Sequence, residues 1–137
     1  MNFLLIATSF SFLIVGNITK HLPLKVLWVV SSLNHANVKW INLFDKALAH
    51  TICLYSIVTC PHTINKYTLG YWFSCLYTIA VFQIYKLSYI PGLKGDLWHG
   101  SIHIISSTGM VLHYYANPEK VHWTPFLEFL LGFYLIL

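Results

Sequence analysis

The chain is poor in charge, and arginine is absent from it. Its 137 residues include two aspartates, two glutamates and eight lysines, so charged side chains make up only 9% of the sequence. A soluble globular domain has roughly 25% charged residues, and this chain therefore has too little polar surface to face water on all sides. The lysines form no run or stripe that would suit a nucleic acid, which argues against a nucleic-acid partner.

Cysteine is also scarce. Cys53, Cys60 and Cys75 are odd in number and lack the spacing of a zinc-binding motif. We expect them to be buried thiols that pack as small hydrophobic side chains.

Hydrophobic residues dominate the rest of the sequence. They make up 57% of it, and aromatic residues alone make up 17%. The apolar stretches are too long and too uniformly apolar to alternate as barrel strands. Because a spanning helix needs about 20 mostly apolar residues, the sequence predicts an all-α, polytopic membrane helical bundle with about six transmembrane helices. A single domain over residues 1–137 is expected.

Apolar segments are separated by turn-forming residues. Pro23 lies in the first turn of the second segment, where its missing N–H costs little. Asp96 is expected to cap the fifth segment. The first segment has no clear cleavage site, which favours a retained helix over a cleaved signal peptide. The six segments cover residues 2–16, 22–36, 44–60, 68–90, 96–116 and 123–137.

Histidines in the fifth segment are the first indication of a functional site. Ionisable groups at membrane depth are costly and usually face the interior of a bundle. His99 and His103 are four residues apart, so on a helix they lie one turn apart on one face and can hold one cation together. Taken alone, such a pair is more often a polar contact in a helix core.

The second and third segments bring further polar residues to the same side of the membrane. His35 ends the second segment and Asp45 opens the third, on either side of a short link. The chain crosses away in the third segment and returns in the fourth, so the fifth begins on the side of His35 and Asp45. Ser31 lies one turn before His35 on the same helix face. Three histidines and one carboxylate are therefore predicted to meet at one membrane face.

Three neutral imidazoles with a fourth position left open are the ligand set of a catalytic zinc ion. His35, His99 and His103 would then bind Zn²⁺. Asp45 would accept the proton of an attacking water, and Ser31 would donate to a developing oxyanion. Two plainer interpretations compete with these roles. Ser31 would bond only to the preceding helical turn, and Asp45 would be simply a helix N-cap.

The order Ser31-x-x-x-His35, then Asp45, then His99-x-x-x-His103 resembles the CREST superfamily of membrane hydrolases, which includes alkaline ceramidases and the progestin and adiponectin receptors. The resemblance implies that the three histidines bind zinc, that the aspartate orients or deprotonates the water, and that the serine stabilises the tetrahedral intermediate. It also implies hydrolysis of the amide bond of a ceramide-like lipid, in an endomembrane such as the ER or Golgi.

The number of helices departs from the family pattern. The family has three helices between the aspartate helix and the final histidine helix, whereas this sequence has one. Losing two helices keeps the parity of crossings, so the site can still assemble on one face. Besides a lipid amide hydrolase, two alternatives stay open: a CREST-like protein that keeps the metal for structure or receptor-like lipid binding, and a small membrane scaffold without metal. A haem held by two histidines is a further alternative.

The remaining histidines receive no role in the site. His50 lies off the helix face of Asp45 and is expected to be a polar core residue. Solvation at the membrane interface would explain those near segment ends, which are His21, His62, His113 and His122.

Overall fold

The computed structural model describes residues 1–87, 91–117 and 128, and every regular element in those residues is helical. The all-α class is therefore confirmed for the described part of the chain. A short 3-10 turn, η1 (Lys39–Ile41), precedes the third α-helix. The α-helices are α1 (Phe3–Ile18), α2 (Leu22–His35), α3 (Asn42–Thr59), α4 (Lys66–Leu87) and α5 (Gly92–Ala116).

Local chemistry accounts for several helix ends. The Asn2 side chain accepts a hydrogen bond from the Leu5 amide at 3.2 Å and so caps α1. Pro23 lies in the first turn of α2, as predicted. After α2, Asn37 adopts a left-handed backbone with φ of 72°, which asparagine tolerates better than most residues. The chain can therefore turn back sharply toward α3.

The prediction that Asp96 caps α5 is wrong. The helix begins at Gly92, directly after Pro91, and it has no side-chain cap. Pro91 is the N-cap residue, with an extended backbone of φ −77° and ψ 162°, so α5 starts earlier than the apolar pattern indicated. Asp96 consequently lies inside the second helical turn.

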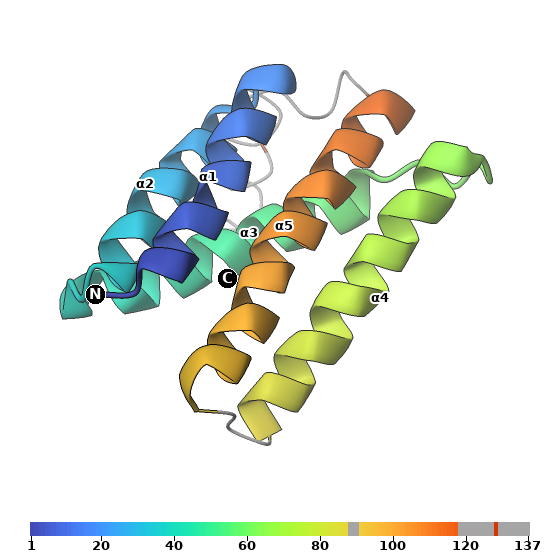
Figure 1. Cartoon of the computed structure of the whole chain (residues 1–137). Helices are drawn as coiled ribbons and strands as arrows, with labels where there is room; N and C mark the ends of the chain where they lie inside the picture. The colour runs from blue at the N-terminus through green and yellow to red at the C-terminus, as the bar shows by residue number, and fades with distance from the viewer. Residues whose placement is uncertain (88–90, 118–127, 129–137) are drawn as a thin grey trace.

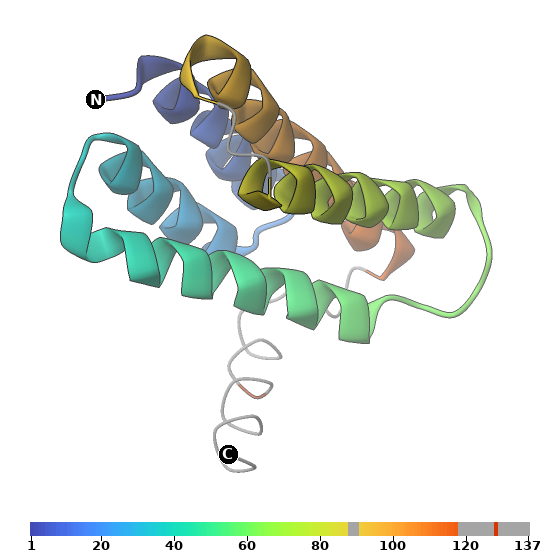
Figure 2. The ribbon, with the colours of Figure 1, turned by 90° about the horizontal axis from the view of Figure 1, so that it is seen from below.

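Helix α1 lies between α2 and α5 and packs against both (Figure 1). Helix α4 packs along the other side of α5, and α3 crosses the row of helices next to α2 (Figure 2). The Asn2 amide donates to the His35 carbonyl oxygen at 2.9 Å, which fixes the start of α1 to the end of α2. The starts of α1 and α5 and the end of α2 therefore meet at one end of the bundle.

The main apolar core lies where α1, α2, α3 and α5 meet. Burying one large apolar side chain contributes about 1.5–3 kcal/mol, so this core holds α1 at one rotation about its axis. That rotation decides which way the polar residues of α1 face. The buried members are Phe12, Val15, Leu24, Leu27, Ile52, Tyr55 and Met110.

Two of the cysteines belong to a second apolar cluster. Cys60 and Cys75 are buried together with Tyr71, and Cys53 is half-buried. The prediction of buried thiols that pack as small hydrophobic groups is therefore confirmed for Cys60 and Cys75, whereas Cys53 is only partly buried.

Glycines on α5 allow two neighbouring helices to approach closely. A Cβ atom on Gly109 would overlap the Ser74 hydroxyl and lie 2.9 Å from the Ser74 Cβ of α4. A Cβ atom on Gly100 would lie 3.0 Å from the Thr8 Cγ2 of α1. Small residues at such crossings bring helix backbones together, and here they place α5 within reach of side chains on both neighbours.

Among the described helices, none combines the length and the apolar character of a membrane-spanning segment. The predicted sixth segment, residues 123–137, lies outside the described residues except for Glu128, whose side chain is exposed.

Replacing Gly109 with alanine should destabilise the bundle by about 1–3 kcal/mol, because an added methyl group overpacks the crossing with Ser74. Thermal unfolding followed by circular dichroism would show a lower midpoint. The neighbouring exposed Thr108 bonds only to the Ile104 carbonyl of its own helix, at 2.8 Å, so Thr108→Ala should leave the midpoint almost unchanged. An unchanged midpoint in Gly109→Ala would contradict the close crossing.

Candidate metal centre

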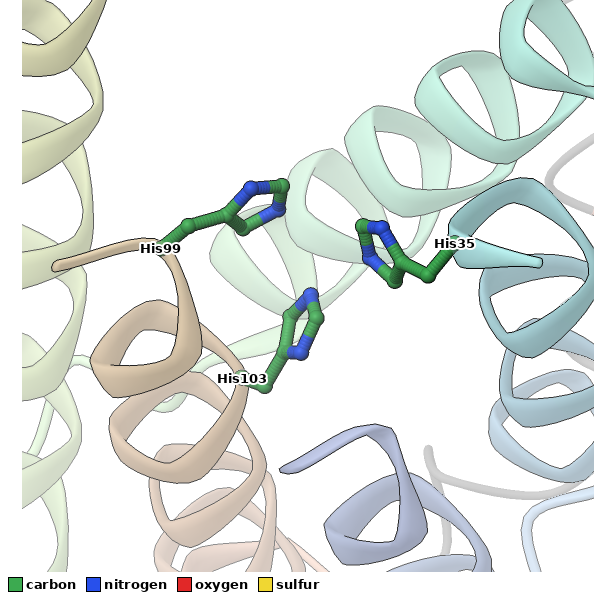
Figure 3. A group of neighbouring side chains, drawn as sticks. All are labelled: His35, His99 and His103. Atoms are coloured by element: carbon green, nitrogen blue, oxygen red, sulfur yellow. The ribbon is translucent and has the colours of Figure 1, made fainter. Parts of the chain in front are cut away.

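Histidines from two helices meet at one end of the bundle. One ring nitrogen from each of His35, His99 and His103 lies within 4.8 Å of the other two, and the ring centroids are 4.9–5.3 Å apart. Figure 3 shows the three rings around a common space, with His35 coming from α2 and the other two from α5. The predicted convergence is therefore confirmed, while the role of these residues as metal ligands stays a prediction.

His35 offers a buried ring nitrogen that no described residue satisfies. The residue is 8% exposed in the last turn of α2, and its Nε2 is buried without a hydrogen-bond partner among the described residues. Buried polar atoms without partners are rare in folded proteins. A cation held between this ring and the rings of His99 and His103 would satisfy that nitrogen.

His103 is held in place by hydroxyl groups of α1. Its Nδ1 lies 3.0 Å from the Thr8 Oγ1 and 3.4 Å from the Ser9 Oγ. Because these hydroxyls occupy Nδ1, Nε2 is the nitrogen left to face the other two rings, and one nitrogen of this ring points into that space (Figure 3). Metal-bound histidines commonly bond to an oxygen through their second ring nitrogen, and His103 has this arrangement.

Ser31 is buried one turn before His35, but its hydroxyl makes a contact that the sequence did not predict. Its Oγ lies 3.2 Å from the Ser9 Oγ of α1. The plainer interpretation, that Ser31 bonds only to the preceding helical turn, is therefore wrong. The hydroxyl belongs instead to the group of α1 contacts around His103.

Asp45 lies in the first turn of α3, half-buried, and its Oδ2 accepts a hydrogen bond from the Asn34 amide group at 2.7 Å. Helix α3 begins at Asn42 without a side-chain cap, so the interpretation of Asp45 as an N-cap is wrong. Asn34 precedes His35 directly, and the bond therefore ties Asp45 to the corner where the histidines meet. Asp45 is not part of the group of ligand atoms that lie within 4.8 Å of one another.

A second carboxylate, Asp96, acts on the centre through its charge. It lies half-buried on α5, three residues before His99, and interacts electrostatically with both His35 and His99. Lys46 of α3 also interacts with His99. The negative charge of Asp96 favours a cation at the centre, and the positive charge of Lys46 opposes it.

Three polar residues of this region were not assigned to the site from the sequence. Thr8 and Ser9 carry hydroxyl groups in a mostly apolar stretch, and this was the sequence signal that could have assigned them to the site. Asp96 precedes His99 by three residues and His103 by seven, the spacing that places side chains along one stripe of a helix. That spacing would have found Asp96, had it not been interpreted as a cap.

The exposure of the other histidines agrees with the prediction in some cases and differs from it in others. His50 is exposed, and its Nδ1 lies 2.6 Å from the Lys46 carbonyl oxygen, so the expectation of a core residue is wrong. His62 is exposed in the loop after α3, as expected. His122 lies outside the described residues.

His21 and His113 are completely buried rather than solvated at segment ends. The turn between α1 and α2 folds onto α3, so the His21 ring stacks on the Tyr55 ring with centroids 6.4 Å apart. His113 reaches across from α5, and its Nε2 lies 3.1 Å from the Thr59 Oγ1. The ends of these helices are therefore covered by their neighbours.

The group of three histidines fits a metal ion that prefers nitrogen ligands. Zinc ligands lie about 2.0–2.1 Å from the ion. One ring nitrogen of each histidine lies within 4.8 Å of the other two, and rotation of the side chains would bring these nitrogens close enough together to share one ion. Imidazole suits zinc, copper, iron and nickel. Three protein ligands would also leave one position of a tetrahedral ion open.

Comparisons with protein-family models, with curated proteins and with solved structures find no match to this chain.

Adding Zn²⁺ to the purified protein should raise its thermal unfolding midpoint, because an ion that binds only the folded state stabilises it by about 2.7 kcal/mol at 100 times its Kd. His35→Gln and His103→Gln should each abolish the shift. His62→Gln, at an exposed loop position, should keep it. A shift that survives both ligand substitutions would show that zinc binds elsewhere.

Proposed function

We propose that the chain is a membrane-embedded, zinc-dependent hydrolase of lipid amide bonds. The observation that carries the proposal is the convergence of His35, His99 and His103, each of which offers one ring nitrogen within 4.8 Å of the other two. Three imidazoles with an open fourth position match the ligand set of catalytic zinc, whereas structural zinc sites use four protein ligands.

A zinc ion bound by these histidines would polarise a substrate carbonyl and activate water as a nucleophile. Asp45 would accept the proton of that water. Its Oδ2 is held by Asn34 at 2.7 Å, which leaves Oδ1 as the oxygen available for the proton. Because Asp45 lies outside the group of ligand atoms, its side chain would have to move toward the histidines for that oxygen to reach the water.

Ser31 would donate a hydrogen bond to the oxyanion of the tetrahedral intermediate. It lies buried on α2, one turn before His35. To donate in this way, the Ser31 hydroxyl would exchange its present bond to the Ser9 Oγ, 3.2 Å away, for one to the substrate. Hydrogen bonds that strengthen as charge develops lower the barrier most.

The substrate class follows from the resemblance to the CREST superfamily. The motif order in this sequence, serine and histidine on one helix, aspartate on the next and two histidines on a later one, resembles that of the alkaline ceramidases. We therefore propose a ceramide-like lipid as substrate and an endomembrane such as the ER or Golgi as location.

A second function is favoured by the hydrogen bonds of the two reacting side chains. The Asp45 carboxylate bonds to Asn34, and the Ser31 hydroxyl bonds to Ser9, so each has a partner other than a substrate. A CREST-like protein that holds a metal for structure, or for receptor-like lipid binding without turnover, would have this arrangement.

Membrane placement is supported by the outer surface of the bundle. Outward-facing hydroxyls such as that of Thr108 donate to their own helix, at 2.8 Å, which satisfies them without water. Helices as short as α2, with 14 residues, would be accommodated by local thinning of the bilayer. Large apolar side chains are exposed on every helix, among them Phe10, Val29, Leu54, Phe73, Leu76 and Ile104.

Purified protein should cleave a fluorescent ceramide in detergent micelles, measured as release of the labelled fatty acid. Asp45→Asn should slow this release about 100- to 10,000-fold, the usual contribution of a general base. Its zinc content should stay normal, because Asp45 is not among the grouped ligand residues.

Asp96→Asn is the matched comparison, since it removes the other half-buried carboxylate of this corner. Normal turnover in Asp45→Asn would contradict the role given to Asp45, whether or not Asp96→Asn loses turnover. Bound zinc without turnover in the wild type would select the non-catalytic function. Absence of zinc from the purified wild type would favour the third alternative, a small membrane scaffold that binds no metal.

The protein should stay in the membrane pellet when membranes of expressing cells are washed with alkaline carbonate, because its exposed apolar side chains would face lipid. Mild detergent should release it. Recovery in the carbonate supernatant, with a native circular dichroism spectrum, would overturn the membrane placement.

A further inference from the structure

Two adjacent hydroxyl groups on α1 share one backbone acceptor. The Thr8 Oγ1 lies 3.1 Å and the Ser9 Oγ 2.7 Å from the carbonyl oxygen of Leu5, one turn earlier. A carbonyl oxygen can only accept hydrogen bonds, so in these contacts both hydroxyls donate. The oxygen atoms of Thr8 and Ser9 are then left with lone pairs, which accept hydrogen bonds from other groups.

The groups that face these lone pairs come from two other helices. His103 of α5 presents its Nδ1 to Thr8 at 3.0 Å and to Ser9 at 3.4 Å. Ser31 of α2 approaches the Ser9 Oγ at 3.2 Å. With the hydrogens of Thr8 and Ser9 directed to Leu5, both partners become donors: Ser31 through its hydroxyl and His103 through an N–H at Nδ1.

A neutral imidazole carries one hydrogen on one of its two nitrogens. A hydrogen on Nδ1 of His103 leaves the lone pair on Nε2, the nitrogen that faces His35 and His99. A hydrogen on Nε2 instead would point into the space between the three rings and would remove a ligand from it. We propose that Thr8 is a positioning residue that fixes His103 as the Nδ1–H tautomer and so makes Nε2 its metal-binding atom; this deepens, and rests on, the metal site proposed above.

Two further contacts keep Thr8 and His103 in register. Ser11, one turn further along α1, donates to the His103 carbonyl oxygen at 3.1 Å. A Cβ atom on Gly100 would lie 3.0 Å from the Thr8 Cγ2 and 3.3 Å from its Oγ1. Helix α5 therefore reaches the Thr8 hydroxyl closely because residue 100 has no side chain.

The direct test is the tautomer of His103 in metal-free, ¹⁵N-histidine-labelled wild-type protein. Nitrogen chemical shifts and one-bond N–H couplings distinguish a protonated from an unprotonated ring nitrogen, and loss of signals in His103→Gln assigns the residue. We expect hydrogen on Nδ1 in the wild type. Hydrogen on Nε2 would overturn the proposal, whatever the protein does with zinc.

Substitutions at Thr8 provide the second test. Thr8→Val keeps the shape of the side chain but removes the acceptor, and it should increase the share of the Nε2–H tautomer and weaken zinc binding about 10- to 100-fold, as loss of a partner of a ligand histidine commonly does. Thr8→Ser restores the acceptor and should restore both measurements. Wild-type tautomer and zinc affinity in Thr8→Val would contradict the role of Thr8.

Two controls separate this role from a general effect on folding. Thr51→Val makes the same chemical change on α3, at an exposed hydroxyl that donates to the Ala47 carbonyl of its own helix at 2.7 Å, and should leave tautomer and affinity unchanged. Gly100→Ala keeps the Thr8 hydroxyl but displaces it, and should shift the tautomer in the direction of Thr8→Val. If the wild type shows hydrogen on Nδ1 but binds no zinc, the tautomer assignment stands and the metal proposal fails.

Discussion

The centre depends on the packing of α1 against both α2 and α5. His35 and His103 belong to helices that are separated by α3 and α4 in the sequence, and α1 contacts the backbone of each. The Asn2 amide donates to the carbonyl of His35 at 2.9 Å, and the Ser11 hydroxyl donates to the carbonyl of His103 at 3.1 Å. Each bond fixes the backbone that carries one ring, so the separation of the rings is set by a third helix that supplies no histidine itself.

Much of this arrangement could be predicted from the sequence, because it follows from helix geometry and topology. The four-residue spacing of His99 and His103 puts both rings on one helix face. The alternation of chain direction from helix to helix brings His35 to the same end of the bundle, and this follows from the number of helices between α2 and α5. Proline and glycine located most helix ends to within a few residues, with α5 as the exception because Pro91 starts it before the apolar pattern does.

What could not be predicted depends on the rotation of one helix against another. The local sequence says little about which face of α1 meets α5, since the segment is apolar apart from a few hydroxyl-bearing residues such as Thr8, Ser9 and Ser11. The rotation is set by contacts between helices. Phe12 packs into the core shared with α2, α3 and α5, and Gly100 of α5 leaves room for the Thr8 side chain. The bond between Asp45 and Asn34 was missed for a similar reason, because it depends on how the link between α2 and α3 turns.

The bond between Asn2 and His35 also has a practical consequence. Because the Asn2 amide lies 2.9 Å from the His35 carbonyl oxygen, any peptide fused ahead of Met1 emerges beside the three imidazoles. A polyhistidine purification tag in that place would bring a high local concentration of competing imidazoles to the same ion. Metal bound by such a fusion would report on the tag as much as on the bundle, and an affinity handle of different chemistry avoids this confusion.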